Sequence, residues 1–459
     1  MKILSLIVAS AALTATPSVS PPSEQERLDA RYDRALAAGY KALILCSAIS
    51  NAERNGTTRT AESVHEWELT GIYPRLDPII RDLNYEIVRG PDNQISHVTV
   101  EWSDDMPARL AVHKRSRGCA VQPIGSTIVS ATPAPHTGQP AGATKRRHAV
   151  DPMAANLGKK RVDVGAAFTG KYGEGRTTVV TVLQEGKLVG EQYADGFFAT
   201  TPQRTWSVAK SIAATIVGAA LHRGEANIGD SAGLGDGSDD PRRAITIDDA
   251  LRMASGRYSD TPGNRTDPLY WGGTSVDERA QNWPLINAPG TIYRYANNDT
   301  LAAVQAIEGT FEEHSPADVL RTIGMKNTVA ETDSQGNYVL SSQVWSTARD
   351  LARLGQLMLN DGVTQSGERI LPENWRDYVS TPSGPQPEGR PFGYGAGWWL
   401  MNNSEGVPSD TFAAFGNRGQ YIVVVPSRNV VIVRRGENMV GTRFDIAAFT
   451  RDVLASLDE

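Results

Sequence analysis

The sequence predicts an α+β fold, an α/β sandwich in which an antiparallel sheet flanked by helices is built from the two ends of one domain. The segment "TVVTVLQEGKLVGEQYA" at 178–194 has the alternation and the Glu-Gly-Lys turn of a hairpin. Strand-like runs return at 421–426 and 430–436, and a terminal helix is expected over about 440–457. The long helical stretch from 206 to about 380 is expected to form an all-helical lobe, with a groove between lobe and sheet.

A smaller α+β unit is expected before this domain. Apolar residues recur at helical spacing over 24–55, and strand-like runs follow at 95–103 and 108–115. A Pro-, Ser- and Gly-rich stretch that includes a basic cluster then reads as a linker. The predicted organisation is a signal peptide over 1–20, an N-terminal α+β extension over 21–120, a linker over 121–160 and the main domain over 161–459.

The composition excludes two broad classes of protein. A chain of 459 residues that is 40% hydrophobic and 21% charged can bury a sizeable core, which excludes disorder along its whole length. A formal net charge of −6 provides no basic surface for a phosphate backbone, so nucleic acid is excluded as a main partner.

The first residues have the pattern of a secretory signal peptide. "MKILSLIVASAALTATPSVS" combines one lysine, an apolar stretch too short to span a bilayer comfortably, and small residues. We therefore expect an exported protein, periplasmic or secreted, without stable membrane insertion. No other run is expected to reach the length of a transmembrane helix.

The chain contains two cysteines, Cys46 and Cys119. In an exported protein they are expected to form a disulfide, which would stabilise the N-terminal unit by about 4 kcal/mol. The alternative is a pair of buried free thiols. Neither cysteine has a second cysteine or a histidine at ligand spacing, so no metal site is predicted.

The tetrad from Ser207 to Lys210 opens an otherwise apolar helical run, "SIAATIVGAAL". Residues three apart share one face of a helix, so the two side chains can hydrogen-bond. A buried ammonium loses its proton more easily than an exposed one, and Lys210 could then exchange a proton with a serine hydroxyl that is unreactive alone. The alternative is a lysine that reaches the surface along its apolar stem.

A second motif, Tyr295-Ala-Asn297, follows some way along the chain. This combination resembles the serine β-lactamase and penicillin-binding-protein superfamily, and in particular its class C β-lactamase, esterase and aminohexanoate-dimer (nylon-oligomer) hydrolase branch. Segments such as "YGAGWW" at 394–399 and "FGNRGQYIVVVP" at 415–426 resemble further landmarks of that group. The resemblance implies a β-lactamase/transpeptidase-like fold.

The resemblance also implies roles for these residues. Ser207 would attack a carbonyl and form an acyl-enzyme, and either Lys210 or Tyr295 would be the base. Asn297 would bind the substrate amide or Lys210, or would instead support a turn. No cofactor is implied, and the partner would be a small molecule or a short peptide.

The third motif of the superfamily departs from its usual Lys or His. The matching positions are Asn417, Arg418 and Gly419, where Arg418 would either supply a displaced cation to the substrate or lie on the surface. The backbone N–H groups of Ser207 and Gln420 would form the oxyanion hole. This departure makes β-lactam hydrolysis less expected than amide or ester hydrolysis.

Tyr270 and Trp271 would line the acyl pocket or simply pack in the core. The expected function is an exported serine hydrolase that cleaves an amide or ester. The alternatives are a weakly active or inactive binding or sensor protein on the penicillin-binding fold, and a β-lactamase or D-amino-acid peptidase. The oligomeric state is not predicted.

Overall fold

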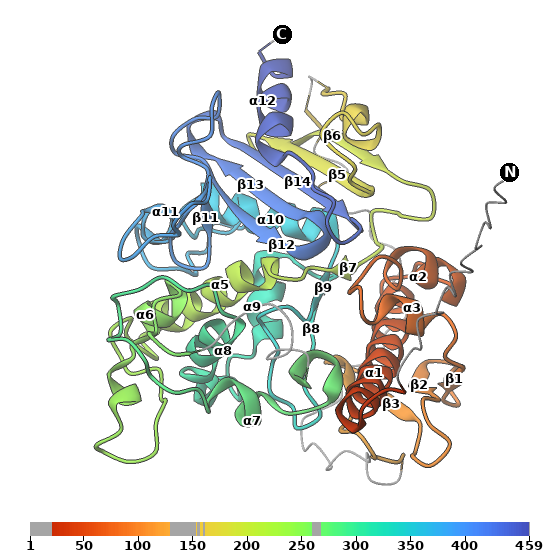
Figure 1. Ribbon diagram of the computed structural model, residues 1–459. Coiled ribbons are helices and arrows are strands. Elements are labelled where there is room, and N and C mark those ends of the chain that lie inside the picture. The colour runs from red at the N-terminus through yellow and green to blue at the C-terminus, as the bar shows by residue number, and fades with distance from the viewer. Residues whose placement is uncertain (1–20, 129–152, 154–156, 159–160, 259–267, 459) are drawn as a thin grey trace, which may run out of the picture.

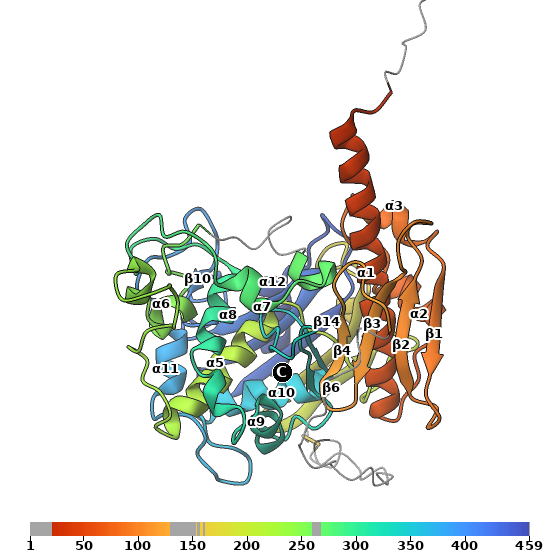
Figure 2. The ribbon, with the colours of Figure 1, turned by 90° about the horizontal axis from the view of Figure 1, so that it is seen from below.

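The computed structural model describes residues 21–128, 153, 157–158, 161–258 and 268–458. Within them, a small N-terminal unit packs beside a larger unit made of a sheet and a helical lobe (Figures 1 and 2). The predicted signal peptide and most of the predicted linker, including its basic cluster, lie outside the described residues.

The N-terminal unit, Ser23 to Val121, is a long helix packed on a four-stranded antiparallel sheet. A capping box between Ser23 and Glu26 starts the helix, which confirms the helix predicted over 24–55. The two predicted strands are confirmed as β2 and β3, whereas the partly exposed β1 and the four-residue β4 were missed. The elements are α1 (Glu24–Arg54), α2 (Ala61–Trp67), α3 (Asp77–Ile80), β1 (Tyr85–Arg89), β2 (Ile95–Val100), β3 (Arg109–Lys114) and β4 (Gly118–Val121).

Helix α1 is, among the described helices, the one long and apolar enough to cross a membrane by length and composition. The expectation that no run beyond the signal peptide reaches that length is therefore wrong. The most apolar 18-residue window of α1 is 100% buried inside the protein, as in the core helix of a soluble protein. A signal sequence near an N-terminus passes the same test of length and composition.

A disulfide joins α1 to β4 inside the N-terminal unit. Cys46 and Cys119 are both buried, their Cα atoms lie 6.1 Å apart, and the bond closes a sequence separation of 73 residues. Of the two interpretations left open by the sequence, the structure contains the disulfide rather than two free thiols.

The main sheet has seven antiparallel strands in the order β10-β11-β12-β13-β14-β5-β6. Strand β14 pairs with β5, with Val182 opposite Ile432, so the sheet joins the two ends of the domain as predicted. The strands are β5 (Thr177–Gln184), β6 (Lys187–Tyr193), β10 (Gly393–Tyr394), β11 (Trp399–Leu400), β12 (Phe412–Gly416), β13 (Gln420–Val425) and β14 (Val430–Gly436).

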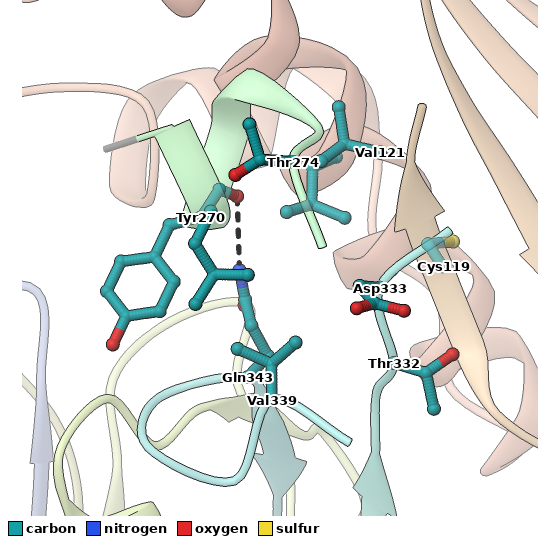
Figure 3. A pocket seen from close by; sticks show the side chains of 10 residues that line it. Cys119, Val121, Tyr270, Thr274, Thr332, Asp333, Val339 and Gln343 are labelled. Carbon is teal, nitrogen blue, oxygen red and sulfur yellow. Dashed lines mark hydrogen bonds between the residues drawn. The ribbon is translucent and has the colours of Figure 1, made fainter. Parts of the chain in front are cut away.

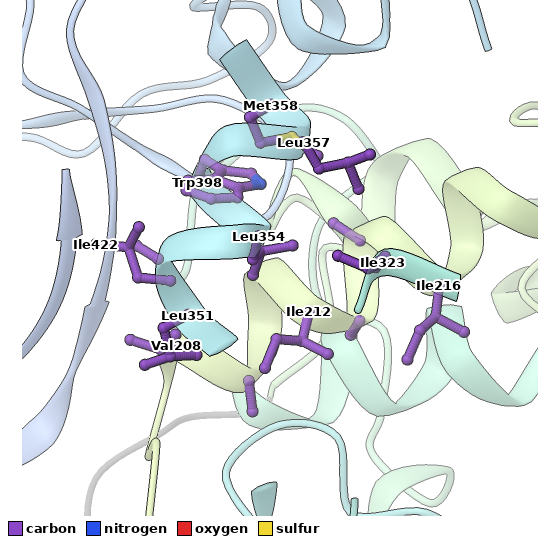
Figure 4. Packing of buried hydrophobic residues seen from close by; sticks show 14 of the residues in the cluster. Val208, Ile212, Ile216, Ile323, Leu351, Leu354, Leu357, Met358, Trp398 and Ile422 are labelled. Carbon is purple, nitrogen blue, oxygen red and sulfur yellow. The ribbon is translucent and has the colours of Figure 1, made fainter. Parts of the chain in front are cut away.

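Helices cover both faces of this sheet. The terminal helix α12 packs on one face, and α5 and α10 pack on the other around the apolar core drawn in Figure 4. Helix α12 begins at residue 446, later than expected, where Asp445 caps it. The helices are α5 (Val208–His222), α6 (Ile247–Leu251), α7 (Val276–Ala280), α8 (Asn297–Gln305), α9 (Pro316–Ile323), α10 (Ala348–Leu359), α11 (Trp375–Ser380) and α12 (Ile446–Ser456).

The helical lobe is not entirely helical. It contains a short three-stranded antiparallel sheet in the order β7-β9-β8, made of β7 (Gln203–Arg204), β8 (Val329–Ala330) and β9 (Val344–Ser346). Strand β7 leads directly into α5. These strands therefore position the start of α5 between the lobe and the main sheet (Figure 1).

Candidate active site

Ser207 lies at the turn between β7 and α5, where it is the residue before the first turn of the helix. Its side chain makes no capping hydrogen bond to the helix, and it is half-buried. The preceding residue, Trp206, has a φ of 50° in the left-handed region. A non-glycine residue in that region stores on the order of 1–3 kcal/mol of strain, which surrounding packing must offset.

Lys210 reaches Ser207 from one helical turn further on. Its Nζ donates hydrogen bonds to Ser207 Oγ at 3.2 Å, Asn297 Oδ1 at 2.5 Å and the Ser341 carbonyl at 3.1 Å. The side chain is 1% exposed, and all three acceptors are uncharged. Burial lowers the pKa of Lys210 to about 7. Near neutral pH the amine is therefore present in both protonation states, and the surface interpretation of this lysine is wrong.

Tyr295 completes the group at Ser207. It lies two residues before α8, and Asn297 is the first residue of that helix. The Lys210 Nζ is 5.0 Å from the centre of the Tyr295 ring. Burial raises the pKa of the Tyr295 phenol, and hydrogen bonds to the side chains of Ser207 and Trp399 oppose that rise. The phenol form is thus the stable one at neutral pH.

Aromatic side chains of the main sheet pack beside Tyr295. The Trp399 ring lies 5.2 Å from that of Tyr295 and is stacked on Phe415 at 5.8 Å, while Tyr394 lies 5.9 Å from Tyr295. The sequence analysis named the segment that contains Trp399 only as a landmark. Its position at the site could have been suspected from that motif, but its contact with Tyr295 depends on the fold.

Sequence reasoning missed Ser341, which lies in the loop between β8 and β9. Its carbonyl accepts a hydrogen bond from Lys210, and its hydroxyl shares one with the Tyr270 hydroxyl at 2.8 Å. No local motif marks this serine, because its partners come from distant parts of the chain.

Tyr270 and Trp271 lie in a π-helical turn, Pro268–Gly272, that we call the Tyr270 segment. Both side chains are buried, at 4% and 0% exposure. The Trp271 ring packs against Tyr40 and Tyr73 of the N-terminal unit. Of the two expectations for this pair, packing in the core fits both side chains.

Arg418 does not hold the position expected of a substrate-binding cation. Its guanidinium is buried, pairs with Glu437 at 2.7 Å and donates to the carbonyls of Trp67 and Thr70 in the N-terminal unit. Gly419 lies against Arg434, which donates to its carbonyl at 2.7 Å. Arg418 therefore takes neither of its two expected places, toward the substrate or on the surface, but joins the two units. The contact between Gly419 and Arg434 stays inside the larger unit.

The Gln420 side chain is buried next to Gly416, close to the Ser207 turn. It is fully buried, and its side-chain amide donates to the Gly436 carbonyl and accepts from Arg435. The part of the hairpin that approaches the Ser207 turn is Gly416, where a Cβ atom would collide with the Thr205 carbonyl. Gly416 lies opposite Gln420 across the hairpin, and the oxyanion role expected of the Gln420 backbone N–H stays a prediction.

The comparisons with known proteins agree on the larger unit. Residues 166–453 match the family described as Beta-lactamase. The 6-aminohexanoate-dimer hydrolase of Paenarthrobacter ureafaciens is 23% identical over 306 residues, which are 56% of this chain and 72% of that protein.

Two solved structures have the same fold. A Bacillus anthracis protein, provisionally assigned as a 6-aminohexanoate-dimer hydrolase, superposes with a TM-score of 0.55 at 20% identity, over 66% of this chain and 88% of its own. A Bacteroides dorei protein, provisionally assigned as a beta-lactamase, gives 0.53 at 16% identity, over 64% and 97%.

Proposed function

The chain belongs to the beta-lactamase family, and from this premise we propose that it is a serine hydrolase that cleaves an amide or ester through an acyl-enzyme on Ser207. One observation carries the proposal. The Ser207 hydroxyl lies 3.2 Å from a buried amine, Lys210, whose pKa is lowered to about 7. A serine hydroxyl becomes a nucleophile when a base this close can accept its proton.

Lys210 is the base in this proposal. The unprotonated amine accepts the Ser207 proton while Oγ bonds to the carbonyl carbon of the substrate. Tyr295 is less suited to that step, because burial raises the pKa of its phenol. When the tetrahedral intermediate collapses, the bond from carbon to the leaving group breaks. Tyr295 relays a proton from the Lys210 ammonium to that group, and water then releases the acyl group by the reverse sequence.

The oxyanion of the intermediate needs two N–H donors. Ser207 supplies one at the start of α5, where the helix dipole also favours negative charge. We propose the backbone N–H of Asn417 as the second, in place of Gln420. The support for it is the close approach of Gly416 to the Thr205 carbonyl, since Asn417 is the next residue and is exposed.

A linear amide is the first substrate class to test, because the curated relative is named for the hydrolysis of a 6-aminohexanoate dimer. The contacts of Arg418 add a reason to rank β-lactams lower. Its cation is held by Glu437 and by the N-terminal unit, away from the role of binding a substrate carboxylate.

We also propose that the protein is exported. The Cys46–Cys119 disulfide supports this, because structural disulfides persist mainly in oxidising compartments. Isolation of the native protein under alkylating conditions tests it. Export predicts two unreactive cysteines and a mature chain that lacks the first residues, whereas full alkylation of an unprocessed chain would contradict it.

The activity is tested by intact-mass measurement after incubation with a fluorophosphonate probe. We expect one adduct on the wild-type protein and none on Ser207→Ala. An unlabelled wild type, or equal labelling of both proteins, would refute the serine hydrolase proposal. A panel of 6-aminohexanoate dimers, p-nitrophenyl esters, D-amino-acid amides and nitrocefin then separates the substrate classes.

A further inference from the structure

A buried arginine of the N-terminal unit donates hydrogen bonds to the Tyr270 segment. Arg109 on β3 is 1% exposed, and its guanidinium donates to the carbonyls of Trp271 and Gly272, each at 3.1 Å. The same side chain donates to the carbonyls of Ala35 and Gln122 in its own unit. One cation therefore bridges the N-terminal unit and a segment that lies beside the Ser207 site.

The backbones of the two units also approach each other closely here. A Cβ atom at Gly39 of α1 would collide with the Trp271 carbonyl. Gly273, just after the segment, has a φ of 87°, and a Cβ there would collide with the Gln122 carbonyl. Any side chain at either position would move the segment, so the contact is specified by small residues on both sides.

On its other side, the Tyr270 segment reaches the proposed base. The Tyr270 hydroxyl and the Ser341 hydroxyl lie 2.8 Å apart, and the Ser341 carbonyl accepts a hydrogen bond from Lys210 at 3.1 Å. The Tyr270 carbonyl accepts a bond from Gln343, two residues after Ser341 (Figure 3). The position of this loop, and hence of one acceptor of Lys210, depends on where the Tyr270 segment lies.

The strained residue before the nucleophile, Trp206, belongs to the apolar cluster that includes the Tyr270 segment. Trp206, with its left-handed φ, packs in one apolar cluster with α1, Tyr270 and Trp271. The Arg204 guanidinium covers its ring at 3.8 Å. Packing of this kind is what keeps a strained conformation populated, and part of it is supplied by the N-terminal unit.

We propose that the N-terminal unit is a positioning element of the active site, and that Arg109 is a positioning residue acting through Tyr270 and Ser341 on Lys210. The proposal rests on the proposed hydrolase function. It assigns a role to the part of the chain outside residues 166–453, and it makes the placement of the base depend on a contact between units.

The test compares two buried cations of the N-terminal unit. Arg109→Met removes the bridge, whereas Lys41→Met removes a lysine whose bonds, to the carbonyls of Ile80 and Leu83, stay within the unit. With a fluorophosphonate as probe, below the unfolding transition of every variant, we expect phosphonylation of Ser207 to slow about tenfold in Arg109→Met and to change less than about twofold in Lys41→Met.

Two further variants separate positioning from a general loss of structure. Arg109→Lys keeps a donor to the carbonyls and is expected to recover part of the rate. In a Tyr270→Phe background, Arg109→Met is expected to slow the reaction little further, because the hydrogen bond between Tyr270 and Ser341 is already lost. Fully multiplicative effects of the two substitutions would overturn the route through Tyr270.

The outcomes also distinguish the positioning role from the proposed hydrolase function on which it rests. An unlabelled wild-type protein refutes the hydrolase function itself. A labelled wild type, with Arg109→Met reacting at the wild-type rate, overturns only the positioning role. Should Arg109→Met fail to fold, Arg109→Lys and Tyr270→Phe still decide: both slowed supports the proposal, and both at the wild-type rate overturns it.

Discussion

Two lysines of this protein are buried to the same extent but contact different groups. Lys41 in α1 and Lys210 in α5 are each 1% exposed. Burial lowers the pKa of Lys41 to about 8, an effect that Asp82 opposes, and lowers the pKa of Lys210 to about 7. Lys41 donates to the backbone carbonyls of Ile80 and Leu83, whereas Lys210 also donates to a hydroxyl.

The comparison shows that burial alone does not make a lysine a catalytic base. It makes both amines easier to deprotonate, because a charged group is disfavoured away from water. A carbonyl has no proton to give, so Lys41 can only hold its neighbours together. The half-buried Ser207 hydroxyl does have a proton to give. Once it passes that proton to Lys210, its oxygen can act as a nucleophile. The chemistry therefore comes from the neighbour of the lysine rather than from its pKa alone.

The largest effect is expected for Lys210→Met. Removal of the proton acceptor should slow acylation of Ser207 by about 1000-fold, in the range that general bases contribute. The measurement is the rate of adduct formation with an activated ester, and circular dichroism checks the fold. A loss below about tenfold would mean that Lys210 is not the base.

Loss of the disulfide should act on the unit that holds Lys41 rather than on the site that holds Lys210. The double variant Cys46→Ser with Cys119→Ser is expected to lose about 4 kcal/mol of unfolding free energy in the N-terminal unit, because the 73-residue loop is no longer closed. Denaturant unfolding followed by proteolysis of that unit measures it. An unchanged unfolding midpoint would contradict the expectation.

Tyr295→Phe should have a smaller effect on the site than loss of the base. The variant keeps the ring against Trp399 but removes the hydroxyl that bonds to Ser207. We expect kcat/KM to fall about 100-fold through loss of proton relay. A loss confined to KM, with kcat intact, would instead indicate a role in substrate binding.

The smallest effect on rate is expected at Lys41. Lys41→Met should leave acylation within about twofold of the wild type while it reduces stability by about 1–3 kcal/mol, since two buried carbonyls lose a donor. The chemical denaturation curve and the labelling rate are measured on the same preparation. Slowing of acylation comparable to that of Lys210→Met would remove the distinction between the two lysines.

The part of the site that follows from local geometry is the pair Ser207 and Lys210, which a helix places on one face. Tyr295 and Asn297 were expected at the site from the resemblance to the superfamily, and the structure places Asn297 at the start of α8. The antiparallel sheet followed from two strand patterns at opposite ends of the domain. Alternation and helical spacing are properties of short segments, so they can be recognised without knowledge of the tertiary contacts.

The rest depends on contacts between distant segments. Ser341 contacts Lys210, 131 residues away, and Arg109 contacts Trp271, 162 residues away. Neither residue carries a local signal. The motif around Arg418 does not show which way its side chain points, because that depends on the fold. Its guanidinium pairs with Glu437, and Gly416 is the residue whose backbone approaches the Thr205 carbonyl.

The pH dependence of Ser207 acylation tests the central claim most directly. Because the unprotonated form of Lys210 accepts the proton, the rate should rise with pH along a single titration centred near pH 7, the value to which burial lowers its pKa. Lys41→Met should leave that midpoint in place. A rate that does not change between about pH 5 and 9, or a midpoint that moves with Lys41, would contradict the account.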